Sequence, residues 1–516
     1  MRFRFSMFFI LLTVSVNLLS QVENYVRYIN PDVARNHLEY LASDELEGRE
    51  AGEKGQKLAG AYLMQNFLSY GLPPVNESYF QRFNLRVSTP QNIFMILSGD
   101  TAKYFSDFLH NSDFADSNFK NSESVFIGYG IALDKYNELD KIDVKDKVCF
   151  MMDDIPEFKK RSFNRSVIES INIWRDRYKK IQNLVNLGAK AIIIINPKVE
   201  FYKKSFAHSF TSSKMMLATD TFSVKIPLLF ISEEKADSLL TLGGLPSGYF
   251  KTKKKIINRG IPMSAELSLK IGIQSNIINS KISSENVLGY IEGTDKKEEL
   301  IIVTAHYDHI GKHDGNIFNG ADDDASGTTA LLMMAKAFSK AKFEGNGPRR
   351  SILFMPVSAE EKGLLGSRYY SENPIFPLVN TVANLNIDMI GRVDKAHHDA
   401  EGIPNPDYVY IIGSNFISDD LHKINENQNK LHTNLELDYT FNSLTDPNRF
   451  FQRSDHYNFA KHNIPVIFYF NGTHEDYHKH TDTADKIDFL KLSKITRLIY
   501  YTAWELSNRE NRIILD

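Results

Sequence analysis

The fold class follows from the stretch Leu300-Ile301-Ile302-Val303-Thr304-Ala305-His306-Tyr307-Asp308, a short apolar run that ends in a histidine and an aspartate. A run of this length, rich in β-branched residues, is typical of a strand that is buried on both faces. Further runs of the same kind alternate with helical patterns through the second half of the chain. We therefore expect an α/β fold, with a mostly parallel sheet that is flanked by helices on both faces.

The expected elements of this region follow one another in regular alternation. Expected strands cover 300–305, 351–357, 382–387, 408–412 and 465–470, and expected helices cover 326–341, 364–371, 419–431 and 489–509. Ligands of such sheets bind at the carboxyl ends of the strands. Four polar residues come directly after expected strands: His306, Glu360, Glu361 and Asp388.

Acidic and histidine motifs occur at these strand ends and in two further loops. The loops are Gly320 to Gly327, which contains three successive aspartates, and the run Tyr477-His478-Lys479-His480. Alone, a Glu-Glu pair is usually solvated surface, an Asp-rich loop usually caps a helix, and His-x-Asp is usually a local hydrogen bond. Because the motifs recur at successive strand ends, together they indicate a metal site.

The number of candidate ligands indicates two metal ions. The five candidates are His306, Asp323, Glu361, Asp388 and His478. One catalytic zinc ion usually takes three protein ligands and keeps a water, so five ligands are too many for one ion. If Asp323 bridges, each of two ions has three protein ligands. Mixed imidazole and carboxylate ligation favours zinc, with cobalt or manganese as alternatives.

Two further side chains have roles that this chemistry requires. Paired ions lower the pKa of a shared water, and a nearby carboxylate must accept its proton. Glu360, which precedes a candidate ligand, is the predicted base. Asp308 is placed to accept the other imidazole N–H of His306 and so fix its tautomer.

A competing motif overlaps this set. His474-Glu475-Asp476-Tyr477-His478 has the His-Glu-x-x-His spacing of one-metal proteases. That motif requires a helix, so that both imidazoles share one face. Here it follows an expected strand and the turn Asn471-Gly472, and its flanks lack helical periodicity. We therefore interpret the spacing as a coincidence and keep only His478.

The rest of the chain indicates export and an inserted domain. Arg2 and Arg4 precede a short apolar stretch, as in a secretory signal peptide of residues 1–20. Residues 31–70 have helical patterns, whereas 85–280 contain short β-rich runs and no carboxylate–histidine cluster. Cys149 lies in an apolar run and is expected to be a buried strand residue. A net charge of -3 gives no reason to expect nucleic acid as a partner.

These motifs resemble the M28 family of zinc peptidases. The matching segments are Ala305 to Asp308, Gly320 to Gly327, Ala359 to Ser367, Asn386 to Met389, Ser454-Asp455-His456, and Tyr477-His478 with Asp482-Thr483. Leu46 to Gly52 is similar to the opening helices of such enzymes. The resemblance implies a three-layer αβα peptidase domain in residues 21–84 and 284–516. Residues 85–283 resemble a protease-associated (PA) domain, a β-rich α+β insertion.

The resemblance also implies a role for each site residue. His306 and Asp388 would hold one zinc ion, Glu361 and His478 the other, and Asp323 would bridge, with two Zn²⁺ per chain. Position within each motif favours Asp323 over its two neighbours and His478 over His480. Glu360 would be the general base, and Tyr477 matches a tyrosine that hydrogen-bonds the oxyanion in some members. Asp455 and His456 lie near the site without an assigned role.

The predicted function is that of an exported dinuclear zinc aminopeptidase, periplasmic or extracellular, acting on peptides or proteins. It would have no stable membrane span after signal cleavage; its oligomeric state is open. One alternative is a carboxypeptidase or dipeptidase of the same family. Another is a one-zinc enzyme, such as a glutaminyl cyclase or a His-Glu-x-x-His protease. A non-catalytic receptor-like protein is disfavoured, because no ligand or base position is lost.

Overall fold

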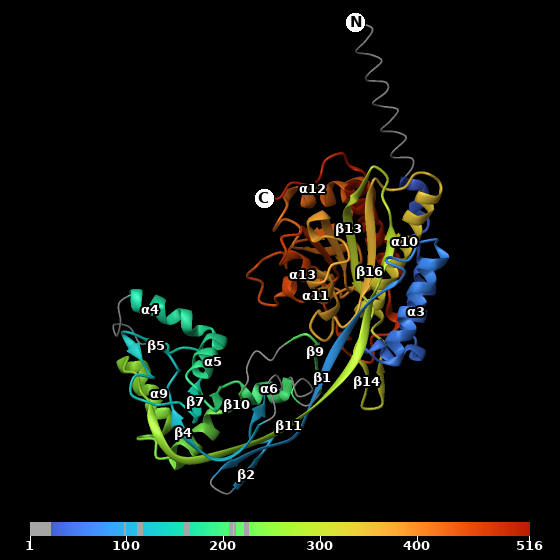
Figure 1. Ribbon diagram of the computed structural model, residues 1–516. Coiled ribbons are helices and arrows are strands. Elements are labelled where there is room, and N and C mark those ends of the chain that lie inside the picture. Colours follow the sequence, from blue (N-terminus) through green and yellow to red (C-terminus); the bar gives the residue numbers. More distant parts are fainter. Residues whose placement is uncertain are drawn as a thin grey trace. The chain divides into compact units, whose positions relative to one another are not determined.

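The computed structural model describes residues 22–97, 100–110, 117–158, 165–205, 210, 213–220 and 226–516. The predicted signal peptide, residues 1–20, lies outside these residues. The chain divides into two compact units (Figure 1). Unit 1 contains the residues up to Leu85 together with Ile282–Asp516, and unit 2 contains Arg86–Lys281.

A mixed sheet forms the centre of unit 1. Within the described residues it has seven strands, in the order β12-β16-β13-β17-β20-β18-β19. The four central strands β16, β13, β17 and β20 run parallel, whereas β12 is antiparallel to β16 and β18 is antiparallel to β20. The edge strand β19 runs parallel to β18. The predicted mostly parallel sheet is thus confirmed. The strands are β12 (Gly289–Ile291), β13 (Lys296–His306), β16 (Arg350–Val357), β17 (Thr381–Ile387), β18 (Tyr408–Ile412), β19 (Glu436–Asp438) and β20 (Val466–Phe470).

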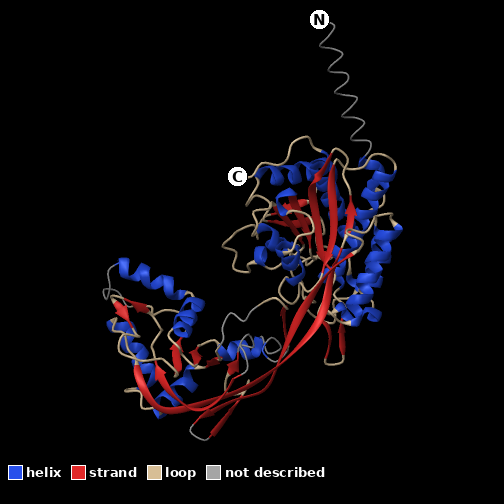
Figure 2. Ribbon diagram, viewed as in Figure 1, coloured by secondary structure: helices blue, strands red, loops and turns tan. Residues whose placement is uncertain are grey.

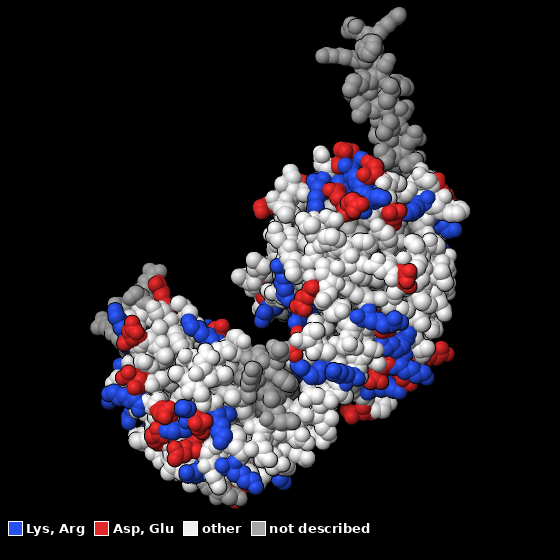
Figure 3. Space-filling view, in the orientation of Figure 1, with Lys and Arg blue, Asp and Glu red and all other residues white. Residues whose placement is uncertain are grey.

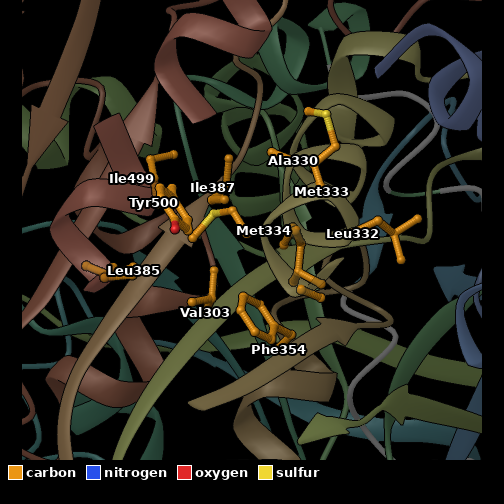
Figure 4. Packing of buried hydrophobic residues seen from close by; sticks show 14 of the residues in the cluster. Val303, Ala330, Leu332, Met333, Met334, Phe354, Leu385, Ile387, Ile499 and Tyr500 are labelled. Carbon is orange, nitrogen blue, oxygen red and sulfur yellow. The ribbon is translucent and has the colours of Figure 1, made fainter. Parts of the chain in front are cut away.

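Helices cover both faces of this sheet. Alternate residues of β13 point to opposite sides: Val303 belongs to one apolar core and Ile302 to the other. In Figure 4, Val303, Leu385 and Ile387 pack with residues of α10 and α14. The helices are α2 (Pro31–Leu41), α3 (Lys54–Ser69), α10 (Gly327–Phe343) and α14 (Phe489–Asn508) on that face, and α11 (Leu365–Glu372) and α13 (His456–Ala460) on the opposite face, with α12 (Asp419–Gln428) beside α14.

Side-chain caps fix where several of these helices begin. The Asn30 side chain accepts a hydrogen bond from the Val33 N–H, and Pro31 occupies the first helical position of α2. Asp488 caps α14 in the same way through the Leu490 and Lys491 amides. Such caps satisfy amides that lack a partner within the helix, and proline at the first position costs no hydrogen bond.

Unit 2 is built on a second sheet. Its described strands follow the order β2-β1-β11-β4-β7-β8-β10-β3, and β4, β7, β8 and β10 run parallel. The predicted apolar runs of this region form strands, and Cys149 is buried within β7. The strands are β1 (Phe80–Leu97), β2 (Asp100–Lys103), β3 (Leu109–His110), β4 (Ser117–Phe126), β7 (Val148–Met152), β8 (Ala191–Ile195), β9 (Lys214–Leu217), β10 (Leu228–Ile231) and β11 (Ala265–Val287), and the helices include α5 (Arg177–Asn186), α8 (Glu233–Leu242) and α9 (Gly248–Arg259).

Two long strands, β1 and β11, contribute to both units. They are hydrogen-bonded neighbours and appear as the two long arrows in Figure 2. Side chains join Gln81 to Asn286 and Ser88 to Asn279. Both pairs join β1 to β11, the strands on which the chain enters and leaves unit 2.

Surface charge is mixed, and no described helix is suited to a membrane. On the face shown in Figure 3, acidic and basic side chains lie intermixed over each unit. Across the described ranges, no helix combines the length and the apolar content needed to cross a bilayer.

Candidate metal centre

The sheet of unit 1 brings the predicted ligands to one edge. His306 is the last residue of β13, and Asp388 directly follows β17. Glu360 and Glu361 lie in the turn between β16 and α11. Because β16, β13 and β17 are parallel neighbours, their carboxyl ends meet at the same edge.

Three of the predicted ligands form a first cluster. His306 Nε2 lies 3.1 Å from Asp323 Oδ1 and 3.6 Å from Asp388 Oδ1. All three residues are buried, and their ligand atoms lie close enough together to hold one metal ion. Separations of this size are those expected between the ligands of one zinc ion with bonds of about 2.0 Å.

A second cluster lies on the other side of Asp323. His478 Nε2 lies 3.1 Å from Asp323 Oδ2 and 3.2 Å from Glu361 Oε2. The Oδ1 atom of Asp323 thus faces the first cluster and its Oδ2 atom faces the second. This is the geometry that a carboxylate needs to bridge two metal ions.

The two neighbours of Asp323 hold the surrounding backbone. Asp324 accepts hydrogen bonds from the amides of His306 and Met389. Asp322 accepts from the Gly391 amide at 2.6 Å, and its other oxygen lies 3.2 Å from His474 Nε2. Of the three aspartates, Asp323 is therefore the one that faces both clusters.

The three histidines near residue 478 have different surroundings. His474 contacts Asp322 rather than either cluster, and the neighbouring Glu475 is exposed. The segment 474–478 forms turns, so the helix that a His-Glu-x-x-His site requires is not present there. His480 is exposed and packs beside Phe318.

The prediction for Asp308 named the wrong acceptor atom. His306 Nδ1 lies 3.0 Å from the backbone carbonyl oxygen of Asp308, whereas the carboxylate Oδ1 lies 3.9 Å away. The Asp308 carboxylate instead accepts a hydrogen bond from the Glu360 amide at 3.2 Å. The local chain path brings the carbonyl nearer, so Asp308 fixes the His306 ring through its main chain and the Glu360 backbone through its side chain.

A chain of hydrogen bonds holds Asp388 in position. Its Oδ2 accepts from the Ser454 hydroxyl at 2.7 Å, and that hydroxyl accepts from the Asn386 amide group at 2.8 Å. Asn386 in turn accepts from the Thr304 hydroxyl at 2.6 Å. This network explains the asparagine in Asn386-Ile387-Asp388 and the serine before Asp455. Contacts of this kind orient ligands at metal sites.

His309 was not predicted as a site residue. Its buried imidazole Nδ1 lies 2.8 Å from Glu361 Oε1 and 3.9 Å from Asp323 Oδ2. Gly320 makes room for this ring, because a Cβ atom there would lie 2.5 Å from ring atoms of His309. The sequence signal was its position three residues after His306, in the same strand-end segment.

Arg49 also supports the site without having been predicted. It is 1% exposed. Its guanidinium donates to the carbonyl oxygens of Tyr307, Asn319 and Gly320 at 2.7 to 3.0 Å. It thus ties together the two loops that carry His306 and Asp323. The segment Leu46 to Gly52 matched the peptidase family, which was the available signal.

The clustered charges shift the ionisation of the site. Burial raises the pKa of Glu360 well above its ordinary value, and the nearby carboxylates of Glu361 and Asp388 raise it further against the opposing effect of His306. Burial also disfavours the ionised form of Asp323, yet the imidazoles of His306 and His478 hold the pKa of Asp323 well below its ordinary range.

The residues present fit a pair of divalent cations. Asp323 Oδ2 and Glu361 Oε1 are buried, and the charged groups that face them among the described residues are the imidazoles of His478 and His309. Buried carboxylates are costly unless a cation balances their charge, and Asp323, Glu360, Glu361 and Asp388 lie together here. A bound cation would supply that charge. Backbone φ angles are positive at Ala359, Met389 and His478, beside three of the site side chains, and such strain is frequent at functional sites.

Comparison with protein families identifies this part of the chain. Residues 286–503, which contain both clusters, match the model of peptidase family M28. This segment belongs to peptidase family M28. The M28 segment therefore begins at the end of β11 and ends within α14.

Related proteins match over parts of their length. Aminopeptidase YwaD of Bacillus subtilis is 28% identical over 216 residues, which are 42% of this chain and 37% of the relative. A probable zinc metalloprotease of Leptosphaeria maculans is 23% identical over 253 residues, or 43% of this chain and 57% of the relative. The chain thus spans well under two thirds of these curated relatives. The structure of an aminopeptidase from Aneurinibacillus sp. strain AM-1 has a similar fold, with a TM-score of 0.59 and 17% identity, covering 96% of this chain and 98% of that one.

The M28 site opens into a small cavity. Besides the side chains of the two clusters, the cavity is lined by Glu360, Met389, Phe450, Arg453, Phe468, Phe470, Thr473 and Tyr477. The predicted Tyr477 therefore lies at the site, and its ring stacks on the ring of His478 with centroids 3.9 Å apart. Asp455 and His456 are buried beside it, where His456 stacks on Phe468.

Proposed function

We propose that the chain is a dinuclear zinc exopeptidase, and specifically an aminopeptidase, that acts on peptides or proteins. The observation that carries the proposal is the position of Asp323, with one oxygen in the His306–Asp388 cluster and the other in the Glu361–His478 cluster. A single ion would leave one of the two clusters without a cation. The names of the M28 relatives support zinc and aminopeptidase activity.

The side chains of this site divide into three tasks. His306, Asp323 and Asp388 would hold one ion, and Asp323, Glu361 and His478 would hold the other. When bound, such ions lower the pKa of a water molecule and polarise the scissile carbonyl. The contacts of Asp388 with Ser454 and of His306 with the Asp308 carbonyl keep these ligands in place.

Glu360 is proposed as the proton carrier. Its carboxylate lines the cavity, 4.0 Å from His306 Nε2, and its backbone is held by Asp308. From this position Glu360 would accept the proton of the attacking water and pass it to the leaving amine, which is the ordinary role of a general base that becomes an acid.

The experiment counts metal and measures turnover in matched variants. Wild type should contain two zinc ions per chain and shorten peptides from the amino end in a peptide library. Glu360→Gln should retain both ions and lose turnover by about a thousandfold, whereas Asp323→Ala should lose metal. Glu372→Gln, an exposed glutamate on α11, is the control. A Glu360→Gln enzyme with nearly normal turnover would refute the base, and shortening from the carboxyl end would indicate a carboxypeptidase.

Two further parts of the proposal concern the remaining chain. Unit 2 is proposed to be a PA-like domain, on the basis of Gly128-Tyr129-Gly130 and Gly188-Ala189-Lys190-Ala191. Export to the periplasm or the exterior is proposed from the sequence pattern of residues 1–20. Detection of the mature protein outside the cytoplasm, with its amino terminus near residue 21, is the test.

A further inference from the structure

Arg453 is an arginine at the mouth of the metal-site cavity with no role assigned so far. It follows η7 (Phe450–Gln452), and its guanidinium carbon lies 4.9 Å from the centre of the Phe450 ring. It lines the same cavity as Glu360 and Tyr477. Its position brings a permanent positive charge to a cavity whose other lining side chains include three carboxylates, two histidines, Thr473 and Tyr477.

The contact between Arg453 and Tyr477 has a defined direction. Arg453 Nη2 donates a hydrogen bond to the Tyr477 hydroxyl oxygen at 3.1 Å. A guanidinium has only donors, whereas a phenol has one proton and can also accept. The Tyr477 oxygen must therefore be the acceptor in this contact, and its own proton points elsewhere. Among the described residues, no oxygen accepts that proton.

The Tyr477 ring is also held from its face. It stacks on the His478 ring at an interplanar angle of 24°. Stacking fixes the plane of the ring, and Arg453 occupies one side of the hydroxyl oxygen. The remaining direction for the proton is the cavity, which Glu360, Asp323 and Met389 line.

We propose that Arg453 is a positioning residue that directs the Tyr477 proton into the cavity. There the hydroxyl would donate to the carbonyl oxygen of the substrate as that oxygen gains negative charge. Tyr477 keeps its proton throughout, so the contribution is a hydrogen bond and no proton is transferred. The inference rests on the proposed peptidase function, and it adds a residue to that function. Donors aimed at a developing oxyanion are typically worth about a hundredfold or more in rate.

The test is a double-mutant cycle in the full-length, zinc-loaded protein. Tyr477→Phe, Arg453→Met and the double variant are compared on an aminoacyl p-nitroanilide that wild type hydrolyses. Tyr477→Phe should lower kcat about a hundredfold, and Arg453→Met about tenfold, with KM changed by less than about twofold. The double variant should be no slower than Tyr477→Phe alone, because Arg453 acts through the hydroxyl.

Three controls separate this role from the alternatives. Arg453→Lys should recover part of the rate, since an ammonium group is also only a donor. Arg35→Met, at an exposed ion pair on α2, should change nothing. Zinc content and unfolding temperature should be equal in all variants, which excludes a merely structural effect.

Several outcomes would overturn the inference. One is a full tenfold loss from Arg453→Met in the Tyr477→Phe background. Another is a change in KM that is confined to dipeptides with a free carboxylate and is not seen with their amides, which would make Arg453 an anchor for the substrate carboxylate. If wild type with two zinc ions hydrolyses no peptide, the proposed function itself fails. That result differs from an active enzyme in which the effects of the two substitutions simply add, which would refute only the role of Arg453.

Discussion

Units 1 and 2 both place charged residues after buried parallel strands, but they neutralise those charges differently. In unit 2, Asp153 follows β7 and pairs with Arg177, with Nε and Oδ1 2.8 Å apart, while Asp154 pairs with Arg175 at 3.0 Å. In unit 1, the ion pairs of Asp323 and Glu361 among the described residues involve only histidines. A strand-end position is therefore not enough for a metal site. The distinguishing feature is a set of acids whose cation is not supplied by lysine or arginine.

Cavity size alone would place the functional site in unit 2 rather than in unit 1. Unit 2 contains a cavity of about 610 Å³ at the ends of β7 and β8, lined in part by Asp153, Arg177 and Lys253. Its charged groups are largely paired with one another, as are Lys253 and Glu233. The cavity beside the two ligand clusters of unit 1 is smaller, yet it is lined by buried carboxylates whose charged neighbours are histidines. Buried carboxylates without a lysine or arginine partner therefore locate the candidate site better than cavity volume does.

The largest expected effect comes from the same substitution at one aspartate of each unit. Asp323→Asn should remove the bridge, lose zinc and lower kcat/KM by about a thousandfold or more, equivalent to about 4 kcal/mol. Asp153→Asn should leave kcat/KM within about twofold, because Asp153 serves an ion pair. Metal analysis and peptide hydrolysis measure both. Equal losses in the two variants would remove the distinction between the units.

Metal removal should affect one unit and spare the other. Chelation should destabilise unit 1 by about 3 to 4 kcal/mol, the linkage expected for zinc at several hundred times its dissociation constant. The chain has two tryptophans, Trp174 in unit 2 and Trp504 in unit 1. Fluorescence-monitored unfolding of Trp174→Phe and Trp504→Phe proteins therefore reports each unit separately. A shift of the Trp174 transition on chelation would contradict this expectation.

Removing a buried cation should lower the free energy of unfolding more in unit 1 than in unit 2. Arg49→Met removes the donor from four carbonyl oxygens, those of Leu41, Tyr307, Asn319 and Gly320, and should destabilise unit 1 by about 3 kcal/mol. Lys180→Met in unit 2 should cost only about 1 kcal/mol. Burial lowers the pKa of Lys180 to about 8, so its charge is already disfavoured in the folded state. Urea unfolding with the two tryptophan reporters compares them; a larger loss for Lys180→Met would reverse the ranking.

An effect smaller than that of Arg49→Met concerns the pH dependence of unit 2. Burial raises the pKa of Glu138 to about 7, against the opposing hydrogen bonds from the Tyr129 and Ile131 amides and the Tyr136 hydroxyl, and against nearby Lys180. Between the unfolded value of about 4.5 and about 7, the folded state holds a proton that the unfolded state releases, so stability falls as pH rises.

Glu138→Gln should remove that dependence. Relative to the variant, wild type should lose about 2 kcal/mol between pH 4.5 and pH 7. Unfolding curves of Trp504→Phe proteins at the two pH values measure the difference. Parallel pH profiles for wild type and variant would show that Glu138 ionises normally.

Several strands of unit 1 and the residues that follow them could be predicted from sequence, because apolar runs mark buried strands. The strand predicted at 300–305 lies inside β13, and 408–412 coincides with β18. His306, Asp388 and Glu361 were found because each follows such a run. Burial on both faces leaves a continuous apolar segment, which is legible without knowledge of its neighbours.

Other features depended on contacts between distant segments. β1 and β11 were not predicted, because their half-exposed, largely polar residues become strands only when paired. The acceptor atom of Asp308, the contact of His309 with Glu361, and the place of Arg453 beside Tyr477 all depend on how loops approach one another. Spacing along the chain does not encode such distances.

The paired strands β1 and β11 make the insertion of unit 2 equivalent to a very long hairpin loop. Gln81 on β1 and Asn286 on β11 are joined by a hydrogen bond, and neighbouring strands lie about 4.8 Å apart in any sheet. A two-residue turn such as Asn-Gly can bridge that gap. Unit 2 is thus a cassette whose gain or loss during evolution would leave the host sheet and its helices in register, and the same junction is a natural place to exchange it for another domain.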